Sequence, residues 1–429
     1  MRMLLVPLLL VLSCLGSTAS AAEVDILLVP DRIWTGTADR SEAGLSVHVH
    51  DGAIAAIGPT ANLAVPPGTR RIDLRGATLM PGLIDLHSHL FLHPYNETPW
   101  NDQVLKEPQD YRTVLAIVHA RQTLLAGFTA LRDLGTEGAG YADVSIKRAI
   151  DEGLVPGPHL FVATRAIVAS SSYGPGPRGF RPDLELPQGA QAISGIDEGV
   201  RAVREQAARG ADWIKLYADY RVGPNGETMP TLSFAEMKAI VEAAHRIGRP
   251  VAAHAGSDAG VRMAVEAGVD TIEHGDAASD ETLQLMKRRG VAFEPTLAAV
   301  VAIGEYFEHY EPGGDATPRM RESERAFRAA LRIGVIIGNG SDVGVFAHGD
   351  NAREPELMVR YGMTPAQALH AATDGAAKIL RQGDRFGRIA PGLRADMAAF
   401  EGDPSASIDA LRKPVFVMKD GAVYREPVP

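Results

Sequence analysis

Residues 251–274 read VAAHAGSDAGVRMAVEAGVDTIEH and contain one complete structural unit. The apolar run 251–255 has the length of a buried strand, and 259–267 has the apolar spacing of an amphipathic helix. Gly268 follows, and glycine commonly ends a helix because it adopts the left-handed conformation without steric cost. A second apolar run, 271–274, comes next. The stretch therefore predicts a strand, a helix and a second strand parallel to the first.

The same unit recurs on both sides of this stretch. Candidate strands lie at 83–89, 130–134, 159–168, 213–217, 251–255, 271–274, 292–297 and 335–339. Helical patterns lie between them at 110–126, 196–209, 234–247, 259–267, 280–289 and 319–332. A strand–helix unit repeated about eight times predicts an α/β fold, the parallel (β/α)8 TIM barrel.

Short β-like segments flank the predicted barrel. They lie at 24–29, 46–50 and 53–57 before it, and at 387–389, 395–401, 415–419 and 423–424 after it. Neither group is large enough to bury a core alone, so we expect them to form one small β-sandwich. The predicted organisation is a signal peptide at 1–22, the N-terminal segment of the sandwich at 23–80, the barrel at 81–385 and the C-terminal segment of the sandwich at 386–429.

The first 22 residues have the features of a secretory signal peptide. Arg2 precedes the apolar run 4–12, and small residues at 19–21 offer a cleavage site. The run is too short to span a bilayer, which takes about 20 residues. We therefore expect a periplasmic or secreted protein without a transmembrane span. The alternative is a lipoprotein anchored through Cys14.

The composition narrows the chemistry. The chain has 429 residues, 45% of them hydrophobic, and a formal net charge of −10, which argues against nucleic acid as a partner. Its one cysteine, Cys14, lies in the predicted leader. An internal disulfide framework, a cysteine-rich zinc site and a cysteine-ligated iron–sulfur cluster are therefore excluded.

Metal-binding side chains stand at the ends of several predicted strands. His87 and His89 are two residues apart, so both point to the same side of the first strand. His254 and His274 each close a later strand, and Asp342 follows the last one. Because barrel enzymes keep their active sites at the carboxyl ends of the strands, this pattern predicts a metal site there.

Lys215 lies inside the apolar strand 213–217, where a buried ammonium group is costly. It either pairs with one carboxylate or has been carboxylated by carbon dioxide, which would make it an anionic oxygen ligand able to bridge two metals. Four imidazoles, one carboxylate and one modified lysine suit one or two divalent ions of the zinc type. A metal pair about 3.5–4 Å apart would activate a shared hydroxide and polarise a carbonyl group.

The sequence resembles the amidohydrolase superfamily from Val24 to about Tyr424. The matching motifs are MPGLIDLHSH at 80–89, the strand lysine, the two single histidines, GSD at 340–342 and PGLRADM at 391–397. Within the superfamily it is most similar to the imidazolonepropionase-like branch, for which SDVGVFAHGDN at 341–351 is typical. Lys215 indicates the group of binuclear dipeptidases and carboxypeptidases that includes prolidase-like enzymes and ochratoxin-hydrolysing amidases.

The resemblance implies roles for the six residues. His87, His89 and Asp342 would hold the more buried metal, His254 and His274 the more exposed one, and N6-carboxylated Lys215 would bridge the two metals, zinc by default. Lys215 and Asp342 would be catalytic, with Asp342 taking a proton from the bridging hydroxide and delivering it to the leaving amine.

The implied reaction cleaves an amide bond to a C-terminal amino acid. The substrate would be a small molecule or dipeptide: Xaa-Pro or another dipeptide, an N-acyl amino acid, or an amide of the ochratoxin A type. Relatives assemble, so we expect a homo-oligomer.

Other polar residues are weaker candidates. Tyr217 shares the inward face of Lys215, and His348 lies in the loop after the last strand, so both are candidate substrate contacts. Further loop candidates are His93, Tyr95, Trp100, Arg178 and Arg181, with Asp85 and Glu273 as acceptors that orient ligand histidines. Histidines assigned a structural role are His48, His50, His119, His159, His245, His309 and His370.

Two other functions remain open from the residues. A cyclic-amide hydrolase or deaminase of the imidazolonepropionase type would need one metal and no lysine bridge, so Lys215 counts against it. A non-catalytic metal- or small-molecule-binding barrel would have no need of Asp342. A serine nucleophile is disfavoured because the chain has no Gly-x-Ser-x-Gly motif.

Overall fold

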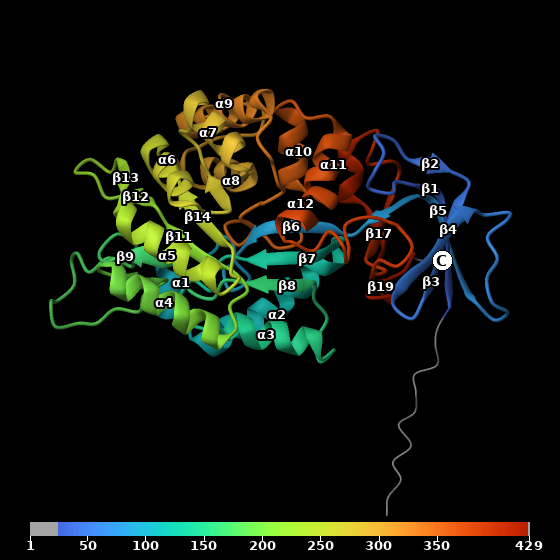
Figure 1. Ribbon diagram of the computed structural model, residues 1–429, viewed down its shortest axis with the longest axis horizontal. Coiled ribbons are helices and arrows are strands. Elements are labelled where there is room, and N and C mark those ends of the chain that lie inside the picture. Colours follow the sequence, from blue (N-terminus) through green and yellow to red (C-terminus); the bar gives the residue numbers. More distant parts are fainter. Residues whose placement is uncertain (1–24, 428–429) are drawn as a thin grey trace, which may run out of the picture.

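The computed structural model describes residues 25–427. The predicted signal peptide and the predicted lipid anchor at Cys14 lie outside these described residues. A sheet of N-terminal and C-terminal strands forms one end of the molecule, and the strands and helices of residues between them form the rest (Figure 1). None of the described helices combines the length and hydropathy that a membrane span requires.

Two parallel ladders form the wall of the barrel. One joins β6, β7 and β8, and the other runs β9-β11-β14-β15-β16, with the short β10 (Gln191–Ile193) at its outer edge. The bounds of these strands are β6 Leu83–Ser88, β7 Phe128–Asp133, β8 His159–Val162, β9 Ile167–Ala169, β11 Ile214–Tyr217, β14 Val251–Ala255, β15 Thr271–His274 and β16 Ala292–Glu294. Strands β6, β7, β11 and β15 are buried along their whole length, as expected for the core of a parallel barrel.

Two predicted strands, at 159–168 and 292–297, have other bounds in the structure. The single strand predicted at 159–168 is wrong: it is divided into β8 and β9, because Thr164 adopts a left-handed conformation (φ +60°) that interrupts the extended chain. The strand predicted at 292–297 ends at Glu294, because Thr296 (φ +50°) turns the chain into a helix.

A regular eighth strand at 335–339 is also a wrong prediction. Two isolated bridges, Phe293 with Ile337 and Ser88 with Val343, stand where a ladder was expected. Backbone hydrogen bonds continue the ring there: Leu86 N donates to Asn339 O at 2.7 Å. Glycines at 338 and 340 leave this segment irregular, and it leads directly to Asp342.

Helices cover the outside of the barrel. Their bounds are α1 Trp100–Lys106, α2 Gln109–Leu125, α3 Ala142–Asp151, α4 Ile196–Arg209, α5 Phe234–Arg246, α6 Asp258–Ala267, α7 Asp280–Arg289, α8 Leu297–Phe307, α9 Pro318–Ile333, α10 Arg353–Arg360, α11 Pro365–Ala371 and α12 Asp374–Ile379. Gly268 ends α6 with φ +99°, as predicted, and Gly210 ends α4 in the same way with φ +111°. A short hairpin, β12 (Asp219–Arg221) with β13 (Thr228–Pro230), extends from the end of β11.

The terminal sheet unites both ends of the described chain. Its strand order is β19-β18-β17-β5-β1-β3-β4, with β2 beside β1, so C-terminal strands continue the N-terminal ones. The bounds are β1 Ile26–Ile33, β2 Glu42–Ala43, β3 Leu45–His50, β4 Ala53–Pro59, β5 Arg70–Pro81, β17 Met397–Glu401, β18 Pro414–Lys419 and β19 Ala422–Arg425. The expected partnership of the two terminal segments is therefore present, while the division of the chain into domains stays a prediction.

The sheet passes directly into the barrel. Gly82 separates β5 from β6, and a side chain there would overlap Thr129 at the start of β7, so only glycine allows this close approach. On the same side of the barrel, His159 at the start of β8 hydrogen-bonds Asp396 of the C-terminal segment at 3.0 Å. His159 therefore links the barrel to the C-terminal segment.

Candidate metal centre and active site

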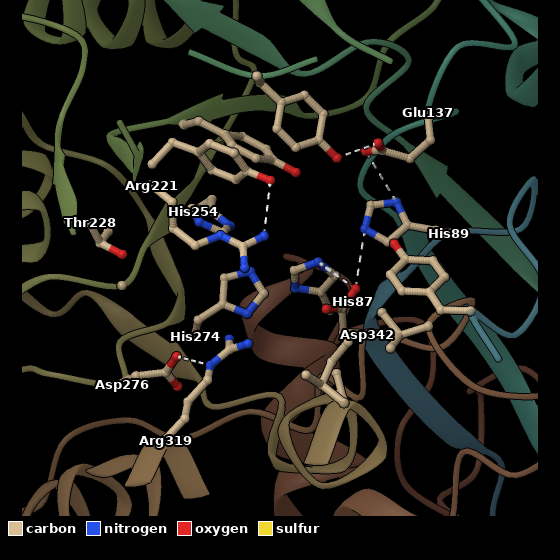
Figure 2. A pocket seen from close by; sticks show the side chains of 18 of the residues that line it. His87, His89, Glu137, Arg221, Thr228, His254, His274, Asp276, Arg319 and Asp342 are labelled. Atoms are coloured by element: carbon tan, nitrogen blue, oxygen red, sulfur yellow. Dashed lines mark hydrogen bonds and ion pairs between the residues drawn. The ribbon is translucent and has the colours of Figure 1, made fainter. Parts of the chain in front are cut away.

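One group of metal-binding side chains is formed by His87, His89 and Asp342. One ligand atom from each of these three buried residues lies within 4.8 Å of the others. Asp342 Oδ1 is 3.5 Å from Nε2 of His87 and 3.3 Å from Nε2 of His89. Figure 2 shows these three side chains pointing toward one another at the wall of a cavity.

Hydrogen bonds set the orientation of the two histidines. The Nδ1 atom of His87 donates to Glu273 Oε2 at 2.8 Å, and Nδ1 of His89 donates to the Gly135 carbonyl at 2.9 Å. With the proton on Nδ1, the neutral form of each ring has its lone pair on Nε2, which faces Asp342. This is the tautomer that a metal ligand requires.

The loop that carries Asp342 is held by the buried Asp85. Its carboxylate accepts from Ser341 N at 2.9 Å and from Asn351 Nδ2 at 2.7 Å, and Asp342 N donates to His87 O at 2.8 Å. Asp342 itself has φ +60°, a costly conformation for a residue other than glycine. Asp85 Oδ1 also accepts from the backbone N of His87 at 3.1 Å, so Asp85 positions the chain at both His87 and Asp342 through backbone groups.

The second pair of histidines faces the first group. The rings of His254 and His274 are 4.4 Å apart between centroids, and those of His274 and His87 are 5.2 Å apart. Nδ1 of His274 hydrogen-bonds Thr296 Oγ1 at 2.8 Å. The ring of Tyr217 stacks on His254 at 4.3 Å. The structure thus brings the four predicted histidines into one cluster at the strand ends.

Lys215 lies on β11 among these side chains and is 1% exposed. Its Nζ is buried and has no hydrogen-bond partner within the described part of the chain. Burial lowers the pKa of Lys215 to about 8, which favours the free amine that reacts with carbon dioxide. Addition of a carboxylate would supply the missing partners of this nitrogen, so the residues present fit the implied group.

Charges around the cluster are arranged in a buried network. Glu273 accepts from Arg132 Nη2 at 2.9 Å as well as from His87, and although burial opposes it, the Arg132 charge lowers the Glu273 pKa to about 2. Burial lowers the pKa of His87 to about 4. For His89 burial is outweighed by Asp342, which raises its pKa to about 9. The Asp342 carboxylate therefore attracts positive charge where a divalent cation could replace the proton.

The cluster lies in a cavity of about 290 Å³. Five charged residues on its wall were missed by the sequence reasoning. Glu137 lies beside His89, and Arg221, Asp276 and Arg319 lie on the side of His254 and His274 (Figure 2); the fifth is Glu308. They come from loops, a hairpin and the first turn of α9, so no strand-end pattern marks them. Glu137 lies three residues after the predicted strand 130–134, but its neighbours in the loop lie equally near that strand, so this position does not single it out.

The weaker candidates separate into two groups. Tyr95 and Tyr217 line the cavity. His348 does not: it is stacked on His119 at 4.2 Å and its Nε2 donates to the Leu92 carbonyl at 3.0 Å. Its predicted contact with substrate therefore finds no support in the geometry. The other candidates that lie outside this cavity are His93, Trp100, Arg178 and Arg181. His93 hydrogen-bonds Glu107, and Trp100 hydrogen-bonds Glu137. Arg181 pairs with Asp183 at the surface.

A parallel barrel with four histidines, an aspartate and a lysine at its strand ends defines a metal-dependent hydrolase of the TIM-barrel type. Residues 78–425 match the amidohydrolase family, and the chain belongs to this family. It is a hydrolase acting on amide bonds, as predicted.

Individual relatives agree with this assignment. Ochratoxinase from Aspergillus niger is 29% identical over 377 residues, which cover 82% of this chain and 77% of the ochratoxinase. Imidazolonepropionase from Geobacillus thermodenitrificans is 27% identical over 385 residues, covering 83% of each chain. The crystal structure of a Xaa-Pro dipeptidase with methionine bound in its active site superposes with a TM-score of 0.84, at 31% identity, over 94% of this chain and 100% of the dipeptidase.

Proposed function

We propose that the protein is a binuclear metal-dependent amidohydrolase that releases a C-terminal amino acid from an amide. The observation that carries the proposal is the buried, partnerless Lys215 Nζ in the middle of five metal-binding side chains. A single-metal cyclic-amide hydrolase gives no reason to bury an unpaired lysine there.

The proposed metal ligands form two sets, one for each of two ions. His87, His89 and Asp342 would hold one ion, His254 and His274 the other, and carboxylated Lys215 both. Nitrogen and oxygen ligands of this kind suit zinc. When bound, the ions would supply a hydroxide nucleophile at neutral pH and stabilise the negative charge on the reacting carbonyl.

Asp342 is placed to move protons. Burial opposes ionisation of its carboxyl group, but the neighbouring His87 and His89 lower its pKa below the ordinary value, so it is a carboxylate at neutral pH. It can accept a proton from the attacking water and pass it to the leaving nitrogen, the role of a general base and then a general acid.

Two guanidinium groups provide recognition of a substrate carboxylate. Arg319 donates from Nε to Asp276 at 2.9 Å, and its side chain remains 40% exposed at the cavity wall. Arg221 lines the same cavity from β12 and forms no salt bridge with the described residues. A carboxylate beside the scissile amide would match these cations, which favours substrates that end in a free amino acid.

Export and assembly belong to the same proposal. The signal-like pattern at 1–22 supports a periplasmic or secreted enzyme, and the resemblance supports a homo-oligomer. Cell fractionation with an antibody tests the first, and light scattering of the purified protein tests the second.

The function is tested with the purified, metal-loaded protein and a panel of Xaa-Pro dipeptides, N-acyl amino acids, ochratoxin A and lactams. We expect hydrolysis of at least one linear amide with a free C-terminal carboxylate. The same amide with its carboxylate blocked as an ester should be a much poorer substrate. Turnover of lactams alone would contradict the proposal.

A further inference from the structure

Helix α2 presents an apolar stripe to solvent. Its residues Tyr111, Val114 and Val118 are 52%, 60% and 46% exposed. Their spacing of three and four residues places them on one side of the helix. The opposite side packs on the barrel, with Ala116 and Ala120 fully buried. The helix is therefore apolar on the side that faces away from the barrel as well as on the side that faces it.

Helices α7 and α9 have the polar outer face that is usual for a surface helix. On α9 every exposed residue except Pro318 is Arg or Glu. The exposed residues of α7 are Asp280, Glu281, Gln284, Lys287, Arg288 and Arg289. Against this pattern, the stripe on α2 indicates a surface that another molecule covers.

Two charged residues lie beside the stripe, near its two ends. Asp110 and Arg121 are both exposed, and neither forms an ion pair within residues 25–427. They are eleven residues apart, which is about three turns of an α-helix, so both side chains lie on the same flank of the stripe. The surface thus offers an apolar centre with a negative charge at one end and a positive charge at the other.

Two copies of this surface complement each other when the helices pack antiparallel about a two-fold axis. The axis passes near Ala116, midway between Val114 and Val118, so the apolar stripe covers itself. The symmetry keeps each flank on its own side and exchanges the two ends. Asp110 of one copy then lies opposite Arg121 of the other, and the pair occurs twice. A parallel arrangement would place like charges together.

The apolar surface continues beside α2. Helices α2 and α3 are neighbours (Figure 1), and Leu154, which follows α3, is 71% exposed. The chain after Leu154 approaches α2, since a Cβ atom at Gly157 would lie 3.3 Å from that of Ala120. A stable dimer buries roughly 800 Å² on each partner, which requires segments beside α2 as well.

We propose that the stripe formed by Tyr111, Val114 and Val118 binds the same stripe of a second copy of this chain, with the two helices antiparallel about a two-fold axis. The proposal rests on the homo-oligomer of the proposed function and names its surface. It is independent of the amide hydrolysis, because no residue of α2 lines the active-site cavity.

The first test measures the dissociation constant of the dimer by sedimentation of the full-length enzyme. Val118→Asp places an unpaired carboxylate of each copy in the contact, so we expect the dissociation constant to rise about 100-fold or more. Val118 is exposed in the single chain, and circular dichroism checks that the fold is kept. Ile196→Asp on α4 is the matched control, because Ile196 is also 46% exposed.

The second test reverses the charges. Arg121→Asp sets two carboxylates against each other at both ends of the contact, so we expect the dissociation constant to rise about tenfold. Adding Asp110→Arg to this variant restores opposite charges in the antiparallel arrangement. The double variant should return to within about threefold of the wild type.

A wild-type enzyme that is monomeric at its highest soluble concentration would overturn this proposal and the proposed homo-oligomer together. An oligomer that Val118→Asp leaves unchanged, or an Arg121→Asp variant that the second reversal does not rescue, would overturn the proposed α2 contact while the homo-oligomer stands. In each case the hydrolysis assay decides the proposed activity separately.

Discussion

The floor and the rim of the active site are built in different ways. The floor consists of His87, His89, Lys215, His254 and His274, which lie on or directly after the regular strands β6, β11, β14 and β15, and of Asp342, which follows the irregular segment after Ile337. The rim, with Glu137, Arg221 and Arg319, comes from a loop, a hairpin and the start of a helix. The floor can therefore supply the same chemistry throughout a family, while the rim selects what reaches it.

The largest expected effect comes from breaking the floor at Asp342. Asp342→Asn removes the group that carries protons, and we expect kcat to fall by about 10³-fold or more. Thermal unfolding of the purified variant checks that the fold is retained. A variant with a turnover number within threefold of the wild type would show that Asp342 transfers no proton.

A smaller effect is expected at the rim from Arg319→Met. Loss of a charge-assisted contact with the substrate carboxylate should raise KM about 10- to 100-fold and change kcat little. Arg328→Met on the same helix is the control, because Arg328 pairs with Glu324 at the surface. If both variants keep the wild-type KM, Arg319 does not bind the carboxylate.

Beneath the floor, Glu273→Gln should weaken metal binding and also lower the thermal stability, because Arg132 loses the charge of its buried partner. The glutamine no longer carries the charge that makes His87 a strong ligand, so we expect metal affinity to fall about 10- to 100-fold, measured by competition with a chelator. Glu281→Gln, at an exposed site on α7, provides the matched comparison. Equal affinities in the two variants would deny Glu273 this role.

The smallest expected effect is a pH dependence of lysine carboxylation. Burial lowers the pKa of Lys215 to about 8, so the fraction of reactive free amine rises with pH up to about 8 and then levels off. Uptake of labelled carbon dioxide by metal-free protein, followed by NMR, should rise about tenfold per pH unit below 8 and reach a plateau above it. A rate that continues to rise through pH 10 would indicate an ordinary, solvated lysine.

The same contrast explains what could be predicted from the sequence. His254 and His274 could be located because the carboxyl ends of the strands in a parallel barrel lie at one face. Two histidines that are one strand–helix unit apart in the sequence are therefore close together in the fold. Lys215 was noticeable because a charge inside an apolar strand needs an explanation. These arguments depend only on regular structure, which local sequence encodes.

The rest depends on tertiary packing. Helix α8 was missed because its sequence, LAAVVAIGEYF, is apolar almost all round, so its periodicity does not distinguish a buried helix from a strand. Arg319 is one of several arginines on α9, and only the packing of that helix decides which of them faces the cavity. His348 was considered for the opposite reason: its loop is near the site, but its ring packs against His119.

The central claim is that Lys215 joins two metal ions in the floor of this site. Its most direct test is the metal content per chain of the wild type and of Lys215→Ala, measured by elemental analysis of purified protein. We predict close to two ions per wild-type chain and a loss of metal in the variant that formate or another small carboxylate partly reverses. One ion or none in the wild type, or two ions retained in the variant without added carboxylate, would contradict the account.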